Sequence, residues 1–208
     1  MEAHHFETPK TARYFTLGDL QSSNEHWYVL HGYGHDAARF IAKFEPHVSK
    51  NRAFIAPEGM HRFYTNGNSG NVGASWMTKE DRASDIHDYL RFLDGLANAL
   101  SSGKTIHVLG FSQGAATASR WVVHAKQAFK ALVLWAGMLP PDLNIPHESL
   151  LLKKVEITVV YDPNDPYRTD DMWDKTSQFL LDNNLKYKLI EYTGGHKIMP
   201  EPLKDLLG

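Results

Sequence analysis

The sequence contains no cysteine in its 208 residues. This absence excludes disulfide bonds, thiolate metal sites and a cysteine nucleophile. It also contains no run of about 18 apolar residues, so we expect no transmembrane helix and no stable membrane insertion. The N-terminus lacks a basic segment followed by an apolar one, which is not the pattern of a signal peptide. These absences together favour a cytoplasmic protein.

A strong charge of either sign is also lacking, because the formal net charge is only −2. Nothing therefore favours nucleic acid or an anionic membrane as a partner. Hydrophobic residues make up 42% and charged residues 22%, which is ordinary for a globular protein. We find no internal repeat and no linker, so we expect residues 1–208 to form a single domain. The pair His4-His5 could be a metal-binding tail, but a frayed terminus is the better interpretation.

Strand-like and helix-like segments alternate along the chain, which predicts an α/β fold with a mostly parallel central sheet flanked by helices. Between the third expected strand and the longest expected helix, residues 58–79 are rich in glycine and asparagine, and we expect them to form an irregular, packed loop. Asp85, His87 and Asp88 could form a metal cluster, but a solvated polar face is favoured. Strands are expected at residues 13–17, 26–30, 52–56, 105–109, 130–135, 155–161 and 186–192, and helices at 36–44, 79–100, 115–123, 169–181 and 200–207.

The segment Gly110-Phe111-Ser112-Gln113-Gly114 fits the pattern G-x-S-x-G. An apolar strand precedes it and a helix follows it, which is the context that this motif needs to present a nucleophilic serine. A strained turn between strand and helix pushes the hydroxyl out above the sheet, and glycines leave room around it. The alternative is an ordinary glycine-rich turn.

A serine nucleophile needs a base and a group that orients the base. In a fold of this type, the acid and then the histidine follow the serine in the chain. His196 is the histidine that stands after both Ser112 and Asp165, so we expect it to be the base. Asp162 and Asp165 compete as the acid; Asp165 is favoured, and the other aspartate is expected to bind backbone in the turn.

Backbone N–H groups should stabilise the negative charge that develops on the substrate carbonyl. One donor is expected at Gln113, directly after the serine. The second is expected at Tyr33, in the glycine-containing loop that follows an early strand; a plain turn is the alternative. His31 in the same loop could act as a second base, but a structural role that holds the loop is favoured.

The chain resembles the phospholipase/carboxylesterase family of α/β-hydrolases, which includes acyl-protein thioesterases and small bacterial carboxylesterases. By position, the resemblance implies Ser112 as nucleophile, Asp165 as acid and His196 as base. Two features depart from the family pattern: Asp162 replaces a glycine that is common there, and Tyr167-Arg168 follow Asp165-Pro166. The resemblance rests on His31-Gly32-Tyr33-Gly34, Ser75-Trp76, Gly110-Phe111-Ser112-Gln113-Gly114-Ala115, Asp165-Pro166 and Gly195-His196.

Residues 136–154 are too short, and too rich in proline, for a cap domain, so we expect an open site. The loop at 58–79 and the segment at 138–146 should form its walls. The substrate-binding residues expected there are apolar, although they could instead pack the loops: Phe63, Tyr64, Trp76, Met138 and Leu139.

The expected function is hydrolysis of small-molecule carboxylic esters through a Ser-His-Asp triad and an acyl-enzyme. No metal or organic cofactor is expected, and a homodimer is left open. Thioesterase or lysophospholipase activity at the same site is the main alternative. A non-catalytic binding protein and a peptidase are less favoured, the first because the triad is intact and the second because no cap or propeller domain is expected.

Overall fold

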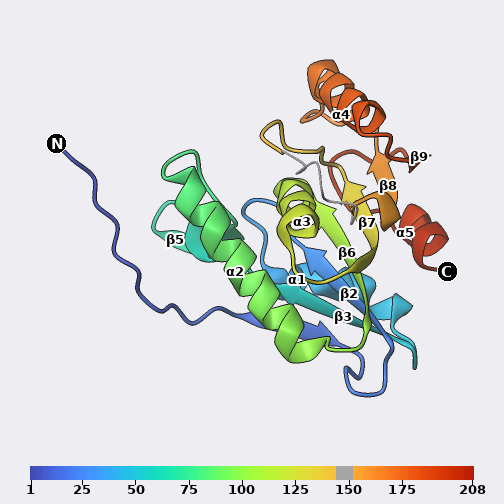
Figure 1. Ribbon diagram of the computed structural model, residues 1–208, viewed down its shortest axis with the longest axis horizontal. Helices are drawn as coiled ribbons and strands as arrows, with labels where there is room; N and C mark the ends of the chain where they lie inside the picture. Colours follow the sequence, from blue (N-terminus) through green and yellow to red (C-terminus); the bar gives the residue numbers. More distant parts are fainter. Residues whose placement is uncertain (144–151) are drawn as a thin grey trace.

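The computed structural model describes residues 1–143 and 152–208 (Figure 1). Seven strands form one sheet in the order β1-β3-β2-β6-β7-β8-β9. The first strand pairs antiparallel with its neighbour, and all other neighbours in this sheet are parallel. The expected α/β fold with a mostly parallel sheet is confirmed. The strands are β1 (Tyr14–Leu17), β2 (Glu25–Leu30), β3 (Arg52–Pro57), β6 (Thr105–Phe111), β7 (Phe129–Trp135), β8 (Glu156–Tyr161) and β9 (Tyr187–Glu191).

Helices cover both faces of the sheet, so successive residues of a central strand are buried on opposite sides. In β2, Tyr28 and Leu30 pack into the core under α2, α3 and α4, whereas Trp27 and Val29 pack into the core under α1 and α5. None of the helices in the described parts of the chain combines the length and apolar character that a membrane span requires. The helices are α1 (Ala37–Ile41), continued by the 3-10 helix η1 (Ala42–His47), α2 (Arg82–Leu100), α3 (Gln113–His124), η2 (Leu152–Lys154), α4 (Asp170–Asp182) and α5 (Pro200–Leu207).

The expectation of an irregular loop at residues 58–79 is wrong for most of that stretch. It contains an antiparallel ribbon of β4 (His61–Asn66) and β5 (Ser69–Ser75). The two strands are joined by the two-residue loop Gly67-Asn68, in which Gly67 has a φ of 58°. Glycine at the first position of such a loop allows a hairpin turn that matches the twist of the strands. The Gly67-Asn68 pair between the two strands is the sequence signal that could have predicted this ribbon.

Between β7 and β8, the described residues form no cap domain. They consist of residues 136–143, of which Leu139 and Leu143 pack into the core, and of η2 and its flanks. Pro146 and the neighbouring part of the expected wall lie outside the described residues. The first residues of the chain form an extended, exposed segment that runs away from the sheet (blue in Figure 1).

Trp76 is a core residue, which contradicts the expectation that it lines a substrate groove. Its side chain is 0% exposed, and its ring lies against those of His31 and Tyr89. The indole N–H donates to the carbonyl oxygen of His31 at 2.9 Å. A buried indole with a satisfied N–H fixes the loop after β2 against the segment that follows β5.

We therefore predict that Trp76→Phe lowers stability without changing acyl selectivity. The smaller ring leaves a cavity and removes the hydrogen bond to His31, so the free energy of unfolding should fall by about 1–3 kcal/mol. Urea unfolding measures this loss, and Phe6→Leu in the exposed N-terminal segment is the control that should show none. Rates on p-nitrophenyl esters from acetate to octanoate should keep the same order. A changed order of rates in the variant would indicate that Trp76 contacts the acyl chain after all.

Candidate active site

Ser112 occupies a strained turn between β6 and α3, with φ 53° and ψ −118°. Non-glycine residues rarely adopt this backbone conformation, and where they do, the surrounding packing enforces it. A Cβ on Gly110 would lie 2.2 Å from the carbonyl oxygen of Gly114, and one on Gly114 would lie 2.2 Å from that of Leu30. Both glycines are thus required by close backbone contacts. The Ser112 N–H donates to Trp135 O on the neighbouring strand at 2.9 Å, which fixes the turn from the other side.

The structure brings Ser112, His196 and Asp165 into one chain of hydrogen bonds. His196 Nδ1 lies 2.6 Å from Asp165 Oδ2, and His196 Nε2 lies 2.9 Å from Ser112 Oγ. A carboxylate can only accept, so Nδ1 carries the proton and Nε2 accepts from the serine hydroxyl. The side chain of Asp165 is 4% exposed and that of His196 is 19% exposed. This arrangement leaves the imidazole reachable while its orienting partner is shielded from water.

Asp162 binds backbone rather than the histidine ring. Its Oδ2 accepts from the N–H groups of Gly194 (2.8 Å) and Gly195 (2.6 Å), and its Oδ1 accepts from that of Asn164 (2.8 Å). These hydrogen bonds, from Gly195, Asn164 and Gly194, hold the pKa of Asp162 below its usual value. Asp162 therefore anchors the loop that carries His196, which is the kind of role expected for the aspartate that does not meet the ring.

The loop after β2 brings the Tyr33 N–H to the same end of the sheet as Ser112. The next residue, Gly34, donates to Ala74 O in β5, and Ala74 N–H donates back to His35 O. The first N–H groups of a helix have no partner within that helix, so the Gln113 N–H at the start of α3 has no acceptor in α3 itself. Gly32, which precedes Tyr33 in the loop, lies close to the serine, since a Cβ on Gly32 would be 3.2 Å from Ser112 Cβ.

His31 holds the loop that carries Tyr33. Its Nδ1 lies 2.8 Å from Gly32 O, and its Nε2 accepts from the Gly59 N–H at 2.9 Å. A carbonyl only accepts, so the ring is neutral with its proton on Nδ1. Burial lowers the pKa of His31 to about 4. The ring is fully engaged with backbone and buried, so it has a structural role and does not serve as a second base.

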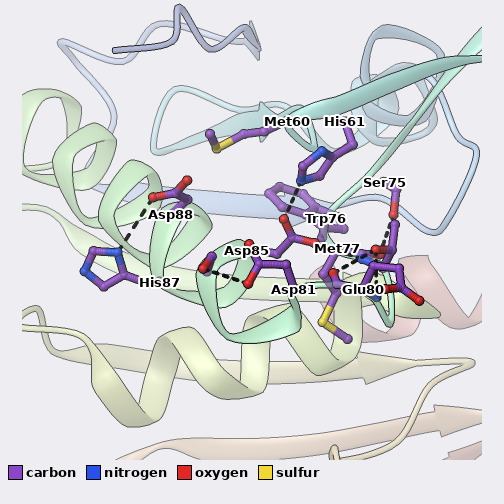
Figure 2. Close-up of polar contacts among 12 residues, drawn as sticks. Met60, His61, Ser75, Trp76, Met77, Glu80, Asp81, Asp85, His87 and Asp88 are labelled. Atoms are coloured by element: carbon purple, nitrogen blue, oxygen red, sulfur yellow. Dashed lines mark hydrogen bonds and ion pairs between the residues drawn. The ribbon is translucent and has the colours of Figure 1, made fainter. Parts of the chain in front are cut away.

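The side chain of Gln113 has a role that the sequence did not reveal. Its Oε1 accepts from the Trp76 N–H at 3.0 Å, and its Nε2 donates to Met77 O at 2.9 Å. The residue after the serine therefore ties α3 to the segment after β5. Figure 2 shows Trp76 and Met77 in this segment, directly after Ser75 at the end of β5. An amide, with one acceptor and one donor end, is suited to binding an N–H and a carbonyl at once.

The polar face of α2 anchors the ribbon. Asp85 lies 2.9 Å from His61 Nε2 in β4 and accepts from the Thr78 N–H at 3.0 Å (Figure 2). His87 and Asp88 are paired with each other on the exposed side, 3.7 Å apart. In the described parts of the chain, no group of three or more such side chains is arranged to hold a metal ion.

Two cavities lie beside the triad. The larger, of about 390 Å³, is lined by His196 together with residues of α1, η1 and the ribbon. The smaller, of about 20 Å³, is lined by Asp165, Tyr167 and Met138. Of the expected groove residues, only Met138 lines one of these two cavities.

The other expected groove residues lie near the site but do not line these cavities. Phe63 packs against the ring of Tyr33, with the ring centroids 5.2 Å apart. Tyr64 follows Phe63 in β4, so it points to the opposite face of the ribbon, where it is exposed. Leu139 is 8% exposed and packs into the core, and its N–H donates to Thr176.

A mostly parallel sheet with a serine at the turn between β6 and α3 and a histidine after β9 defines the α/β-hydrolase class. A family model described as Phospholipase/Carboxylesterase matches residues 24–207. The chain belongs to this family, whose members are hydrolases of carboxylic esters and thioesters. The resemblance expected from the sequence and the expected enzyme class are therefore confirmed. Among curated proteins, no sequence matches the chain.

Solved structures share the fold at low sequence identity. Acyl-protein thioesterase 2 from Zea mays is 16% identical, with a TM-score of 0.76 over 95% of this chain and 96% of that one. A carboxylesterase from Mesorhizobium loti is 17% identical, with a TM-score of 0.73 over 94% of each chain. The Bacillus cereus carboxylesterase is also 17% identical, with a TM-score of 0.69 over 94% of this chain and 92% of that one.

We predict that the two aspartates differ sharply in their effect on turnover. Asp165→Asn removes the acceptor for the Nδ1 proton and favours the wrong tautomer, so kcat on p-nitrophenyl acetate should fall on the order of 10⁴-fold. Asp162→Asn leaves the triad contacts intact but presents an amide donor to backbone donors, so it should lower Tm and reduce kcat far less. The opposite ranking would reassign the acid.

We also predict that His31 makes stability sensitive to acid. Its pKa is about 4 in the folded protein and about 6.5 when unperturbed, so unfolding takes up a proton between these values. The stabilisation of the folded protein by neutral His31 is complete above about pH 6.5. It is lost as the pH falls toward 4, by up to about 1.4 kcal/mol per pH unit.

Urea unfolding of His31→Gln at a series of pH values measures this contribution. The variant should be less stable than wild type at pH 7.5, because the bond to the Gly59 N–H is disturbed. The stability of the variant should also depend less on pH, because the His31 titration is gone. Some pH dependence should remain, because other buried histidines titrate in both proteins. Parallel curves for wild type and variant would contradict the assignment.

Proposed function

We propose that the protein is a serine carboxylesterase that works through a covalent acyl-enzyme on Ser112. The single observation that carries this proposal is the continuous chain of hydrogen bonds from Ser112 through His196 to Asp165, at a turn with a strained backbone. Strain of this kind at a polar residue is typical of catalytic positions. Hydroxyl, imidazole and carboxylate in this order form the arrangement that activates a serine.

In the first half of the reaction, Ser112 Oγ attacks the ester carbonyl carbon while its proton passes to His196 Nε2. The negative charge on the carbonyl oxygen is stabilised by the N–H groups of Tyr33 and Gln113. The imidazolium formed is stabilised by Asp165, which keeps its own charge. His196 then gives the proton to the leaving oxygen as the bond from carbon to that oxygen breaks.

In the second half, a water molecule replaces the alcohol beside His196. Its proton passes to Nε2 as its oxygen attacks the acyl carbon, and the same two N–H groups stabilise the charge. Collapse returns the proton to Ser112 Oγ and releases the carboxylic acid. The buried Asp165 and the anchored loop at Gly194-Gly195 let the ring serve both halves without changing its orientation.

Thioesters and lysophospholipids present the same carbonyl chemistry, so acyl-thioesterase or lysophospholipase activity is the second candidate. A panel of acyl esters and matched thioesters of increasing chain length separates these activities. A purely binding role and peptidase activity are less favoured. Turnover of peptide amides at rates comparable to those on p-nitrophenyl esters would support peptidase activity. A single domain, a cytoplasmic location and a homodimer stay predictions, and the oligomeric state can be measured by light scattering.

We predict that a fluorophosphonate probe labels the wild-type protein at Ser112 and does not label Ser112→Ala. The probe reacts with serines that an adjacent base activates, whereas an ordinary serine is a poor nucleophile. Intact-mass spectrometry gives the stoichiometry, and peptide mapping gives the position. Ser119→Ala is the matched control. The buried Ser119 of α3 donates to Ala115 O and is not expected to react, so this variant should be labelled at Ser112 as wild type is. Equal labelling of Ser112→Ala and wild type would overturn the proposal.

A further inference from the structure

The larger cavity adjoins His196. It is bounded by α1 and η1, by the β4–β5 ribbon and by the loop of His196, and its lining does not include Ser112. In acyl transfer, the histidine gives its proton to the leaving oxygen or sulfur, so the leaving group lies beside the imidazole. A volume of about 390 Å³ accommodates a small leaving group with a polar substituent.

Positive charge dominates the rim of this cavity. Arg39, Lys43 and Lys197 line it and are exposed. Asp36 is the carboxylate among the lining residues, and its Oδ1 already accepts from the Arg39 N–H at 3.1 Å. Among the described residues, no ion pair joins any of the three cations to a carboxylate. The cations thus present more charge to the cavity than the protein itself neutralises.

This cluster of positive charge does not follow from the composition of the chain, which has 24 acidic and 22 basic residues. Burial lowers the pKa of His35, and the positive charge of Lys43 lowers it further. The neutral His35 ring stacks on Phe111, with centroids 5.3 Å apart. The cavity therefore combines an aromatic floor with a cationic rim.

The position of Arg39 is fixed in part by the ribbon. Its Nη2 donates to Asn71 Oδ1 at 3.3 Å, and the carbonyl of Asn71 accepts from the Thr65 hydroxyl at 3.0 Å. A guanidinium has five donors in a planar fork, so one contact to Asn71 leaves others for a ligand. Planar carboxylate and phosphate groups match this geometry.

We propose that the leaving group of the substrate carries an anionic substituent, a carboxylate or a phosphate, which Arg39, Lys43 and Lys197 bind in the cavity beside His196. This inference rests on the proposed esterase function and names the class of alcohol or thiol that the enzyme releases. Carbon atoms between the reacting oxygen and the anion pack against Phe111 and Val72, while the anion stays at the solvated rim.

The test compares three acetyl esters that differ in charge on the leaving group: para-acetoxybenzoate, para-acetoxyphenyl phosphate and the neutral para-acetoxybenzamide. The wild-type kcat/KM should be higher for at least one anionic ester than for the amide by about tenfold or more, the effect of one or two hydrogen bonds to a charged group. The anion with the larger ratio identifies carboxylate or phosphate as the group bound. Higher salt should reduce the ratio, because the cations are exposed.

The variant Arg39→Gln/Lys43→Gln should bring the ratio of anionic to neutral kcat/KM close to one, while Lys188→Gln on the exposed strand β9 should keep it. Equal rates on all three esters in wild type, or a preference that survives both the double substitution and high salt, would overturn the inference. The proposed function is tested separately by fluorophosphonate labelling and by hydrolysis of the neutral ester. If both succeed and no anion preference is found, only the inference fails.

Discussion

The site depends on one close backbone contact, where the start of α3 meets the end of β2. Gly114 lies so near the carbonyl of Leu30 that a Cβ would be 2.2 Å from that oxygen. Leu30 is also paired with Gly110 across the parallel strands β2 and β6. The contact therefore fixes the serine turn relative to the loop after β2, which are the two segments that carry Gln113 and Tyr33, the proposed oxyanion donors. Donors fixed in this way need no rearrangement when charge develops on the substrate.

The turn after β8 divides two tasks between two carboxylates three positions apart. Asp162 satisfies three backbone N–H groups, two of which belong to the residues just before His196. Asp165 contacts the imidazole itself and accepts from the Tyr167 N–H. A carboxylate that accepts several backbone bonds holds its charge and its position. The loop and the ring are thus held by different carboxylates.

Chain order and strand position predicted Ser112, Asp165 and His196 as a group, because the carboxyl ends of parallel strands meet at one edge of the sheet. The β4–β5 ribbon escaped prediction because glycine and asparagine suggest a loop as readily as a hairpin. Whether Trp76 is buried depends on His31 and Tyr89, which come from distant segments. The cationic rim could not be predicted for the same reason, because Arg39 and Lys197 come from distant segments that only the folded structure brings to one cavity.

The cationic rim and the proposed oxyanion donors act at different stages of the proposed reaction. A distant anionic substituent keeps its charge throughout, so Arg39 and Lys43 would bind it about equally in the ground state and the transition state. Such uniform binding improves kcat/KM mainly through KM. The Tyr33 and Gln113 N–H groups meet full negative charge only as the tetrahedral intermediate forms, so they act on kcat. Since the two sets come from different segments of the chain, selection of the leaving group and acceleration of the chemical step can vary independently.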